Sequence, residues 1–350
     1  MIKVFCTKKI TDLLPEKPKK FEGETDPLNR WMINLIKIDR KNVILGICTE
    51  TRFGFLLWNV TKRQYAKLDE VITKAIRDTL TSYGFKPELI DKYVSENVEL
   101  CTGASRTDAA RISSIGRDFQ SVRILRKPDN MLDISFVRSL NRHLYNSENG
   151  YGYPIVSMIE KFREQYGEDP IKQRAFVLET ELDLERYAAK RTIIVPAGYT
   201  FCQLHRILQE TMDWSNAHLY EFELSDELVI SDDEDEYDDR EIASASENRL
   251  EDVLDKGDEF LYRYDFGDNW EVTVRVSDII DDHNKPWASL SLCEGAAPPE
   301  DVGGVYGYLD FLDAYNDPDN PEHDDVIEWV GYRWKPEPNI RGIANRIEHI

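Results

Sequence analysis

The sequence lacks the segments that would place a protein in or across a membrane. No apolar run among its 350 residues approaches the ~20 residues that span a bilayer. Its start, Met1-Ile-Lys-Val-Phe-Cys-Thr-Lys-Lys9, has no long apolar stretch behind its charges and differs from a signal peptide. Only five cysteines occur, scattered and without a CxxC pair, which favours reduced thiols over a disulfide framework. We therefore expect a cytoplasmic protein with no membrane partner.

The short motifs of the common catalytic classes are also missing. The sequence contains no GxxxxGK[ST], no GxGxxG after a predicted strand, no HExxH and no GxSxG. These absences argue against P-loop nucleotide hydrolysis, dinucleotide redox chemistry, zinc proteolysis and α/β-hydrolase chemistry. They identify no cofactor, and they favour a protein that is not an enzyme.

Length and composition indicate two domains. A chain of 350 residues exceeds one ordinary domain, and 41% apolar residues with 17 Tyr, 14 Phe and 7 Trp supply material for two cores. Gly167-Glu-Asp-Pro170 is the best linker candidate, because Gly and Pro stop a helix and no apolar pattern crosses the segment. We expect one domain over residues 1–168 and a second over 174–350.

The two halves carry charge of opposite sign. Residues 1–170 contain 28 Lys and Arg against 23 Asp and Glu, a formal charge of +5. Residues 171–350 contain 16 against 43, a formal charge of −27. The acidic half is a poor general binder of nucleic-acid phosphates, whereas the first half could carry a basic face. Partners stay open: a protein, or nucleic acid through the N-terminal half.

Periodicity predicts helices and strands in mixed order. In the first half, β-rich runs indicate an antiparallel meander, followed by helical spacing; the segments are 31–38, 42–48 and 53–60, then 65–83. In the second half, strands are expected at 175–184, 191–195, 218–224, 259–266 and 270–276, and a helix after Thr200. No βαβ regularity appears. We therefore expect the α+β class, with two domains that each pack helices on a mixed or antiparallel sheet.

Several blocks with rare residues occur in order in the second half. They are Val195-Pro-Ala197, Leu204-His205, Trp214–Phe222, Phe260–Glu271, Cys293–Tyr308, Asp317–Asp325 and Trp329. Over residues 174–350 they resemble the plasmid pRiA4b ORF-3-like family, also labelled an insertion-element passenger or TnpR-like family. The resemblance implies a compact α+β roll and a link to mobile genetic elements, without a reaction. Val305-Tyr306 and Arg191-Thr192 depart from the Pro-Trp and Arg-Arg that the family often has.

The first half resembles an uncharacterised domain family, DUF6933. The matching pieces are Phe5–Lys9, Trp31–Asn34, Thr51-Arg-Phe53 and Arg111–Gly116. This resemblance implies no activity either.

Two segments of the second half place carboxylates beside glycines. In Tyr264-Asp-Phe-Gly-Asp-Asn-Trp270, Asp265 and Asp268 flank a glycine and could converge on Mg²⁺, or they could cap backbone amides in an Asx turn while Trp270 packs in the core. In Pro298-Pro-Glu-Asp-Val-Gly-Gly304, stiff prolines and permissive glycines could fix Glu300 and Asp301 as one wall of a site, or form a structural loop. Both alternatives stay open for each segment.

A candidate pocket follows from these segments and their neighbours. Its residues are His218, Tyr264, Asp265, Asp268, Trp270, Cys293, Glu300, Asp301, Gly303, Gly304 and Tyr306. Asp265, Asp268, Glu300 and Asp301 are the candidate ligands for a divalent metal, and His218 is a candidate acid or base. His205 follows Leu204 on an apolar helix face and is expected to be structural. Cys293 has no neighbouring His in the sequence, so a structural thiol is expected.

Other charged segments allow weaker hypotheses. In the first half, basic residues gather in one region that could face phosphate; they are Arg106, Arg111, Arg117, Arg123, Arg126 and Lys127. Nearby aspartates dilute this patch. In the second half, the acidic run at 232–239 is expected to be a solvated loop, with binding of a basic partner as the alternative.

Three functional hypotheses remain. The favoured hypothesis is a binding or accessory protein associated with mobile elements. The second is a metal-dependent phosphoester hydrolase that uses Asp265, Asp268, Glu300 and Asp301, which requires the two loops to meet at one pocket. The third is a structural fusion in which no pocket is expected.

Overall fold

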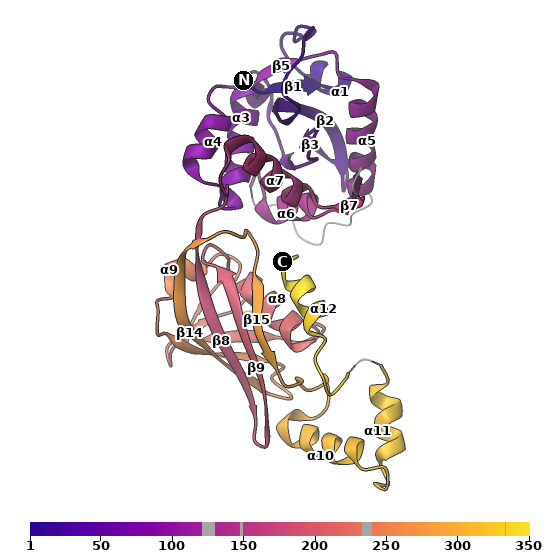
Figure 1. Ribbon diagram of the computed structural model, residues 1–350, viewed down its shortest axis with the longest axis vertical. Helices are drawn as coiled ribbons and strands as arrows, with labels where there is room; N and C mark the ends of the chain where they lie inside the picture. The colour runs from indigo at the N-terminus through magenta and orange to yellow at the C-terminus, as the bar shows by residue number, and fades with distance from the viewer. Residues whose placement is uncertain (121–129, 148–149, 233–239, 333) are drawn as a thin grey trace. The chain divides into compact units, whose positions relative to one another are not determined.

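A computed structural model describes residues 1–120, 130–147, 150–232, 240–332 and 334–350 (Figure 1). It divides into two compact units, the N-terminal unit Met1–Lys172 and the C-terminal unit Gln173–Ile350. Each unit packs helices on one main sheet, which confirms the predicted α+β class. In the described part of the chain, no helix combines the length and apolar character needed to cross a membrane.

The sheet of the N-terminal unit has five strands in the order β4-β3-β2-β1-β5. They are β1 (Lys3–Cys6), β2 (Arg30–Ile38), β3 (Lys41–Cys48), β4 (Gly54–Trp58) and β5 (Glu99–Cys101). Strands β2 to β4 form the predicted antiparallel meander, while β1 pairs in parallel with β2 and β5. A short hairpin, β6 (Tyr145–Ser147) with β7 (Gly150–Gly152), lies apart from this sheet.

Helices surround this sheet. They are α1 (Lys8–Thr11), α2 (Lys62–Tyr65), α3 (Leu68–Ser82), α4 (Pro87–Tyr93), α5 (Arg106–Gln120), α6 (Ile134–Asn141) and α7 (Pro154–Tyr166), with a 3₁₀ turn at Pro27–Asn29. Helix α5 packs on β2 and β3, where Ile112 and Ile115 meet Met32 and Leu45 in the core. Gly167, in the left-handed region at φ 71°, ends α7.

Three segments of this unit have structures that their local sequence patterns do not show clearly. Helix α5 combines many polar residues with an apolar face, because Ile112, Ile115 and Phe119 follow helical spacing and pack in the core. Helix α6 ends at Asn141, and Tyr145 pairs with Gly152 in the hairpin. Thr7 precedes α1 without capping it, since its hydroxyl donates to Asn34 at 2.9 Å.

The C-terminal unit is built on an eight-stranded sheet in the order β12-β11-β10-β13-β14-β8-β9-β15. The strands are β8 (Gln173–Leu184), β9 (Tyr187–Pro196), β10 (Tyr220–Glu223), β11 (Leu228–Ile230), β12 (Glu241–Ala243), β13 (Glu259–Tyr264), β14 (Trp270–His283) and β15 (Ser289–Glu294). All pairs are antiparallel except β11 with β12. The sequence did not predict β11, β12 or β15, which are short or lie at the sheet edges.

One face of this sheet is the core and the other is polar. Residues alternate along each strand, so that Phe260, Tyr262 and Tyr264 of β13 point into the core while Glu259 and Arg263 point outward. The core is closed by α8 (Phe201–Met212), which begins with a capping box between Thr200 and Gln203. The other helices are α9 (Leu250–Val253), α10 (Gly304–Asn316), α11 (His323–Val330) and α12 (Ile340–Ile347).

Candidate functional site

A tight turn between β13 and β14 carries the first acidic segment. Asp265 and Asn269 both have positive φ, 56° and 53°. One carboxylate oxygen of Asp265, Oδ1, accepts hydrogen bonds from the backbone N–H groups of Gly267 at 3.0 Å and Asp268 at 3.4 Å. This is the geometry of an Asx turn, and Trp270 packs fully buried in the core directly after it. The second oxygen, Oδ2, lies 3.5 Å from Nε2 of His218.

The loop between β15 and α10 carries the second acidic segment, and buried donors hold its first half in place. Arg191, only 1% exposed, donates to the carbonyls of Lys190, Glu294 and Gly295 through one terminal nitrogen and to Thr211 through Nε. Gly295 requires its glycine, because φ is +70° and a Cβ would lie 2.1 Å from the carbonyl oxygen of Ala188.

Two tryptophans fix the next residues of this loop. The indole N–H of Trp334 donates to the carbonyl of Ala297 at 2.7 Å, and that of Trp214 donates to the carbonyl of Pro298 at 3.1 Å. Both indole rings are buried. Together with Arg191, they bind four carbonyls between Glu294 and Pro298. We define Glu294–Asp301 as the anchored loop.

The turn between β13 and β14 contacts both the anchored loop and the two glycines that follow it. The backbone N–H of Gly303 donates to Oδ2 of Asp268 at 3.2 Å, and a Cβ on Gly304 would lie 2.8 Å from the carbonyl oxygen of Asp268. The hydroxyl of Tyr264 donates to Oε1 of Glu300 at 2.6 Å. The two acidic segments are therefore adjacent, which is part of what the hydrolase hypothesis requires.

His218, Asp265 and Asp301 converge at this junction. Nε2 of His218 lies 3.5 Å from Oδ2 of Asp265 and 3.3 Å from Oδ1 of Asp301. One donor atom from each of the three lies within 4.8 Å of the other two. Asp265 is buried, whereas the Asp301 side chain is 75% exposed. The site is thus anchored on one side and open to solvent on the other.

The other two predicted metal ligands face different partners. Asp268 accepts from Gly303, as described above. Glu300 accepts from the hydroxyls of Tyr264 and Ser215. Burial, followed by the hydrogen bond to Glu300, raises the pKa of Tyr264, so this phenol is a neutral donor. The metal-like set in the described residues is His218, Asp265 and Asp301, so two of the four predicted carboxylate ligands converge with the candidate acid or base.

A cavity of about 490 Å³ adjoins this junction. It is lined by the anchored loop from Ala296 to Asp301 and by the aromatic side chains of Trp329, Tyr332 and Trp334. Trp329 is 46% exposed and Tyr332 is 91% exposed. Sequence reasoning did not select Arg191, Tyr332 or Trp334. Two features of the sequence could have indicated them. One is an arginine inside an apolar strand, and the other is a pair of aromatic residues beside the proline-rich stretch 336–338.

A buried polar network supports the segment before His218. Nδ1 of His205 lies 2.8 Å from the hydroxyl of Tyr262, and Nε2 lies 2.6 Å from Oδ1 of Asn216. The His205 ring also stacks on Tyr220 at a centroid distance of 3.6 Å. Burial lowers the pKa of His205 to about 4 against the opposing hydrogen bond to Asn216, so the ring is neutral at pH 7. His205 therefore positions Asn216 and the residues that follow it.

The remaining predicted pocket residues lie around the junction without joining the three converging side chains. Gly303 and Gly304 have φ of 93° and 70° and lead into α10. Tyr306 is 74% exposed on that helix. Cys293 is on β15, and burial raises the pKa of its thiol, which disfavours a nucleophilic thiolate. The acidic run lies, from residue 233 on, outside the described residues.

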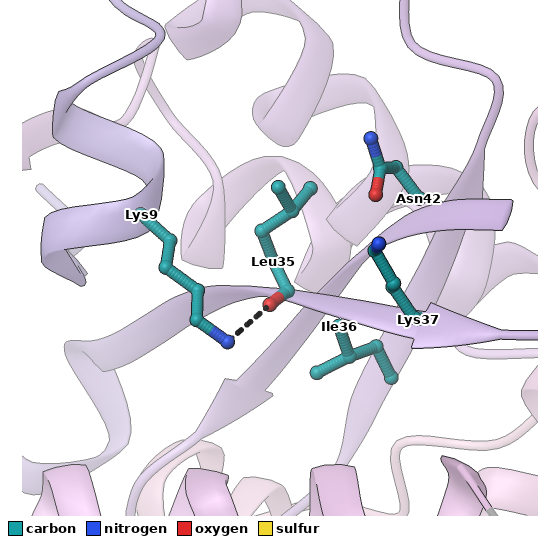
Figure 2. A pocket seen from close by; sticks show the side chains of 5 residues that line it. All are labelled: Lys9, Leu35, Ile36, Lys37 and Asn42. Atoms are coloured by element: carbon teal, nitrogen blue, oxygen red, sulfur yellow. Dashed lines mark hydrogen bonds between the residues drawn. The ribbon is translucent and has the colours of Figure 1, made fainter. Parts of the chain in front are cut away.

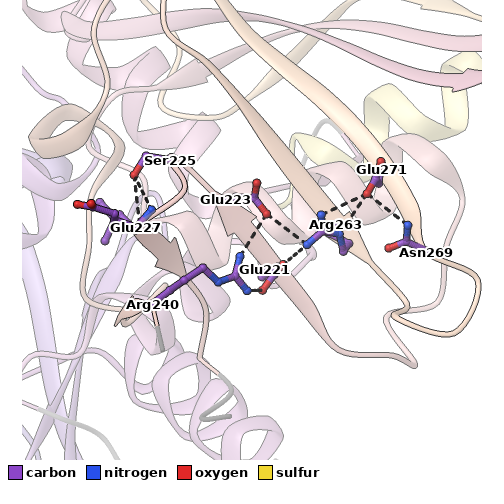
Figure 3. Close-up of polar contacts among 9 residues, drawn as sticks. Glu221, Glu223, Ser225, Glu227, Arg240, Arg263, Asn269 and Glu271 are labelled. Carbon is purple, nitrogen blue, oxygen red and sulfur yellow. Dashed lines mark hydrogen bonds and ion pairs between the residues drawn. The ribbon is translucent and has the colours of Figure 1, made fainter. Parts of the chain in front are cut away.

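Outward-facing charges on the sheet form a separate ion-pair network (Figure 3). Arg263 on β13 lies between Glu221 on β10 and Glu271 on β14, and it also contacts Glu223 at 3.3 Å. Arg240 pairs with Glu221 at 3.0 Å and with Glu223 at 3.2 Å. The cross-strand register places Arg263 directly opposite both Glu221 and Glu271, so this network is structural.

The predicted basic patch of the N-terminal unit is only partly described, because Arg123, Arg126 and Lys127 lie outside the described residues. Arg111 donates to the carbonyl of Thr49, while Arg106 and Arg117 are exposed on α5. A cavity of about 460 Å³ in this unit is lined by Lys9, Leu35, Ile36, Lys37 and Asn42 (Figure 2).

Comparison with known proteins agrees with both sequence resemblances. Residues 174–340 match the family described as plasmid pRiA4b ORF-3-like protein, and residues 3–157 match a domain of unknown function, DUF6933. An uncharacterized protein, y4hQ, of Sinorhizobium fredii is 36% identical over 155 residues, which are 44% of this chain and 79% of that protein.

A solved structure is also similar. It is the protein of unknown function MM3350 from Methanosarcina mazei Go1, with 31% sequence identity and a TM-score of 0.44, covering 49% of this chain and 97% of that chain. Through residues 174–340, the chain belongs to the plasmid pRiA4b ORF-3-like protein family.

Proposed function

We propose that the C-terminal unit is a non-catalytic binding module whose ligand occupies the cavity beside the anchored loop. The observation that carries this proposal is the construction of the wall. Arg191, Trp214 and Trp334 bind the carbonyls of Glu294, Gly295, Ala297 and Pro298. A wall held in this way is ordered before a ligand arrives, so binding requires little further ordering of the loop. The cavity volume lies within the ~300–1,000 Å³ range of small-ligand pockets.

A ligand screen on the full chain tests this proposal. A ligand that binds only the folded state raises the melting temperature by mass action. We expect at least one class among nucleic acids, nucleotides, peptides and co-purifying proteins to do so. The shift should shrink in Trp329→Ala, which removes a lining side chain, and persist in Tyr306→Ala, which removes an exposed aromatic outside the cavity. The absence of any shift across the screen would contradict the proposal.

An accessory role on mobile genetic elements is part of the same proposal. The plasmid in the family's description supports it. Such a role predicts that genes for proteins with this domain lie beside transposase or plasmid-maintenance genes more often than chance allows. A survey of gene neighbourhoods that finds no enrichment would remove this part of the proposal and leave the binding function untouched.

A metal-dependent phosphoester hydrolase is the second candidate, and the convergence of His218, Asp265 and Asp301 favours it. Ligand atoms at about 2.1 Å from one ion and separated by 90–109° lie about 3.0–3.4 Å apart. The measured separations of 3.3 and 3.5 Å from Nε2 of His218 to the two carboxylates are close to this range. Three protein ligands would leave positions for water and for a phosphate oxygen, and the ion would lower the pKa of that water.

Metal analysis with matched variants tests the second candidate. Protein purified without chelator is assayed for bound metal by mass spectrometry and melted in Mg²⁺, Mn²⁺, Zn²⁺ and EDTA. We expect Asp265→Asn to abolish metal binding and phosphodiesterase activity. Asp268→Asn is the control, because Asp268 is in the same turn but accepts from Gly303. Equal loss in both variants, or no bound metal in the native protein, would contradict this candidate.

A further inference from the structure

Among the described residues, four acidic and three basic side chains line the cavity, so their pairing matters more than their number. Asp213 pairs with Arg346, and Asp301 faces His218. Within the described part of the chain, Glu300 accepts hydrogen bonds from the hydroxyls of Ser215 and Tyr264 and pairs with no cation. Glu337 is exposed on the rim. The cavity therefore presents carboxylate charge that neutral donors orient but do not neutralise.

Among the described residues, three cations line the cavity, and two of them direct their N–H groups to other partners. Arg191 donates to four backbone carbonyls, and Arg346 contacts Glu210 and Asp213. The third lining cation, Lys335, is exposed. Among the described lining residues, an anionic ligand would meet the carboxylates of Glu300 and Asp301, with Lys335 as the one cation that neither pairs with a carboxylate nor donates to a carbonyl. The local charge thus favours a cationic ligand.

Aromatic rings supply the second element of cation recognition. Trp329 and Tyr332 line the cavity with exposed rings, and two further apolar side chains, Ile327 and Ile340, are exposed nearby in the sequence. A cation over the face of Trp or Tyr is attracted by the ring quadrupole, and Arg also stacks on such rings. Exposed apolar side chains gathered within one short segment are typical of interaction sites on proteins.

The net charge of the C-terminal half adds a long-range electrostatic attraction for cationic partners. Residues 171–350 carry a formal charge of −27. A field of one sign raises the rate at which oppositely charged partners arrive. A free small amine would gain little from the row of exposed side chains beside the cavity, whereas a peptide can use both the cavity and its rim.

We propose that this cavity binds a basic segment of a protein partner, with an Arg or Lys side chain inserted between the anchored loop and Trp329. The inference rests on the proposed function, since it takes the same cavity as the ligand site. Glu300 and Asp301 accept from the inserted cation, and the rings of Trp329 and Tyr332 cover its aliphatic part. The anchored loop keeps Glu300 in position before the partner arrives.

A labelled hexa-arginine peptide tests the inference by fluorescence anisotropy with the full-length protein. Hexa-glutamate and a Gly-Ser peptide are the control ligands. We expect saturable binding of hexa-arginine alone, weakened about tenfold in Trp329→Ala and several-fold in Glu300→Gln. Tyr306→Ala should bind within about twofold of the native protein, because Tyr306 is exposed but does not line the cavity. Melting curves establish that each variant is folded.

The possible outcomes separate the inference from the function on which it rests. Hexa-arginine binding that is equal in the native protein and in Trp329→Ala reflects diffuse attraction to the acidic surface, and it overturns the inference. A neutral or anionic ligand that binds the native protein and is lost in Trp329→Ala also overturns it, but leaves the binding module standing. If the ligand screen and hexa-arginine both give no binding, the inference and the proposed function fail together.

Discussion

The two units contain cavities of similar volume whose walls are built differently. The cavity of the N-terminal unit, about 460 Å³, is lined by residues of α1, β2 and β3 (Figure 2). The one hydrogen bond that Figure 2 draws among them runs from Nζ of Lys9 to the carbonyl of Leu35 at 3.5 Å. The cavity of the C-terminal unit, about 490 Å³, is walled by a loop that three buried side chains hold in place.

This difference shows that volume alone does not identify a binding site. A hollow beside two surface lysines arises wherever long side chains leave a gap between elements. By contrast, burying a guanidinium and two indole N–H groups to hold one loop requires that each find an acceptor, because an unpaired buried donor is costly. The C-terminal cavity is therefore the better candidate for a binding site with a fixed shape. Substitutions of the anchoring residues test this difference between the two cavities.

The largest expected effect is that of Arg191→Ala. The substitution removes a buried guanidinium and leaves the carbonyls of Thr211, Glu294 and Gly295 without their donor. We expect the C-terminal unit to lose about 3–5 kcal/mol of unfolding free energy, as when one partner of a buried charged network is deleted. Urea denaturation followed by tryptophan fluorescence measures the loss.

Arg186→Ala is the matched control for this substitution. Arg186 is exposed and pairs with Asp313 at 3.2 Å on the surface of the same unit. Such pairs contribute about 0–1 kcal/mol, so the urea midpoint should scarcely change. Equal effects of the two variants would mean that the anchored loop is not held by Arg191, and the contrast between the two cavities would disappear.

The next largest expected effect is a loss of stability at acidic pH that arises from His205. The pKa of His205 is lowered by burial from 6.5 to about 4. Above pH 6.5 the ring is neutral in the folded and the unfolded chain. Between pH 6.5 and about 4 the unfolded chain takes up a proton that the folded chain does not, so stability falls with pH across this window. The loss attributable to His205 is about 3 kcal/mol, and it stops below pH 4.

A double comparison isolates this contribution. Urea midpoints of the native protein and of His205→Gln are measured between pH 7.5 and 4. Carboxylates and His283 titrate in both proteins, so the difference between the two curves reports His205 alone. We expect the variant to be less stable at pH 7.5, and the gap to narrow as the pH falls. A gap that stays constant would show that His205 is not held in its neutral form.

The sequence predicted the fold well wherever a segment carried its own periodicity. The meander at β2 to β4 and the strands β8, β13 and β14 follow from alternating or apolar runs, and α8 follows from its capping residue. The edge strands were not predicted, because they are strands through pairing with a neighbour and not through their composition. In β15, for example, Leu290 and Leu292 pair with β9 on either side of a bulge. Short helix ends, such as that of α6 at Asn141, depend on packing that no local pattern encodes.

The site was harder to predict than the fold. The sequence grouped the turn with the Pro298–Gly304 loop by chemistry, and in the structure these segments are adjacent. It could not decide which carboxylate oxygens are directed together, because that depends on φ at Asp265 and Asp301, both positive. Nor could it connect Arg191 with Gly295 or Trp334 with Ala297, which are separated by 104 and 37 residues in the chain.

The smallest effect sharpens the comparison between the units through a pair of matched indole deletions. The N–H of Trp31 in the N-terminal unit donates to the hydroxyl of Tyr93 at 2.8 Å, and that of Trp334 donates to Ala297 at 2.7 Å. Trp31→Phe and Trp334→Phe each delete one buried hydrogen bond, and each should cost about 1 to 3 kcal/mol of stability. Only Trp334→Phe removes a hydrogen bond that holds the anchored loop, which lines the cavity. It should therefore weaken hexa-arginine binding several-fold while Trp31→Phe leaves the dissociation constant unchanged, and equal dissociation constants would show that ordering of the loop contributes nothing to recognition.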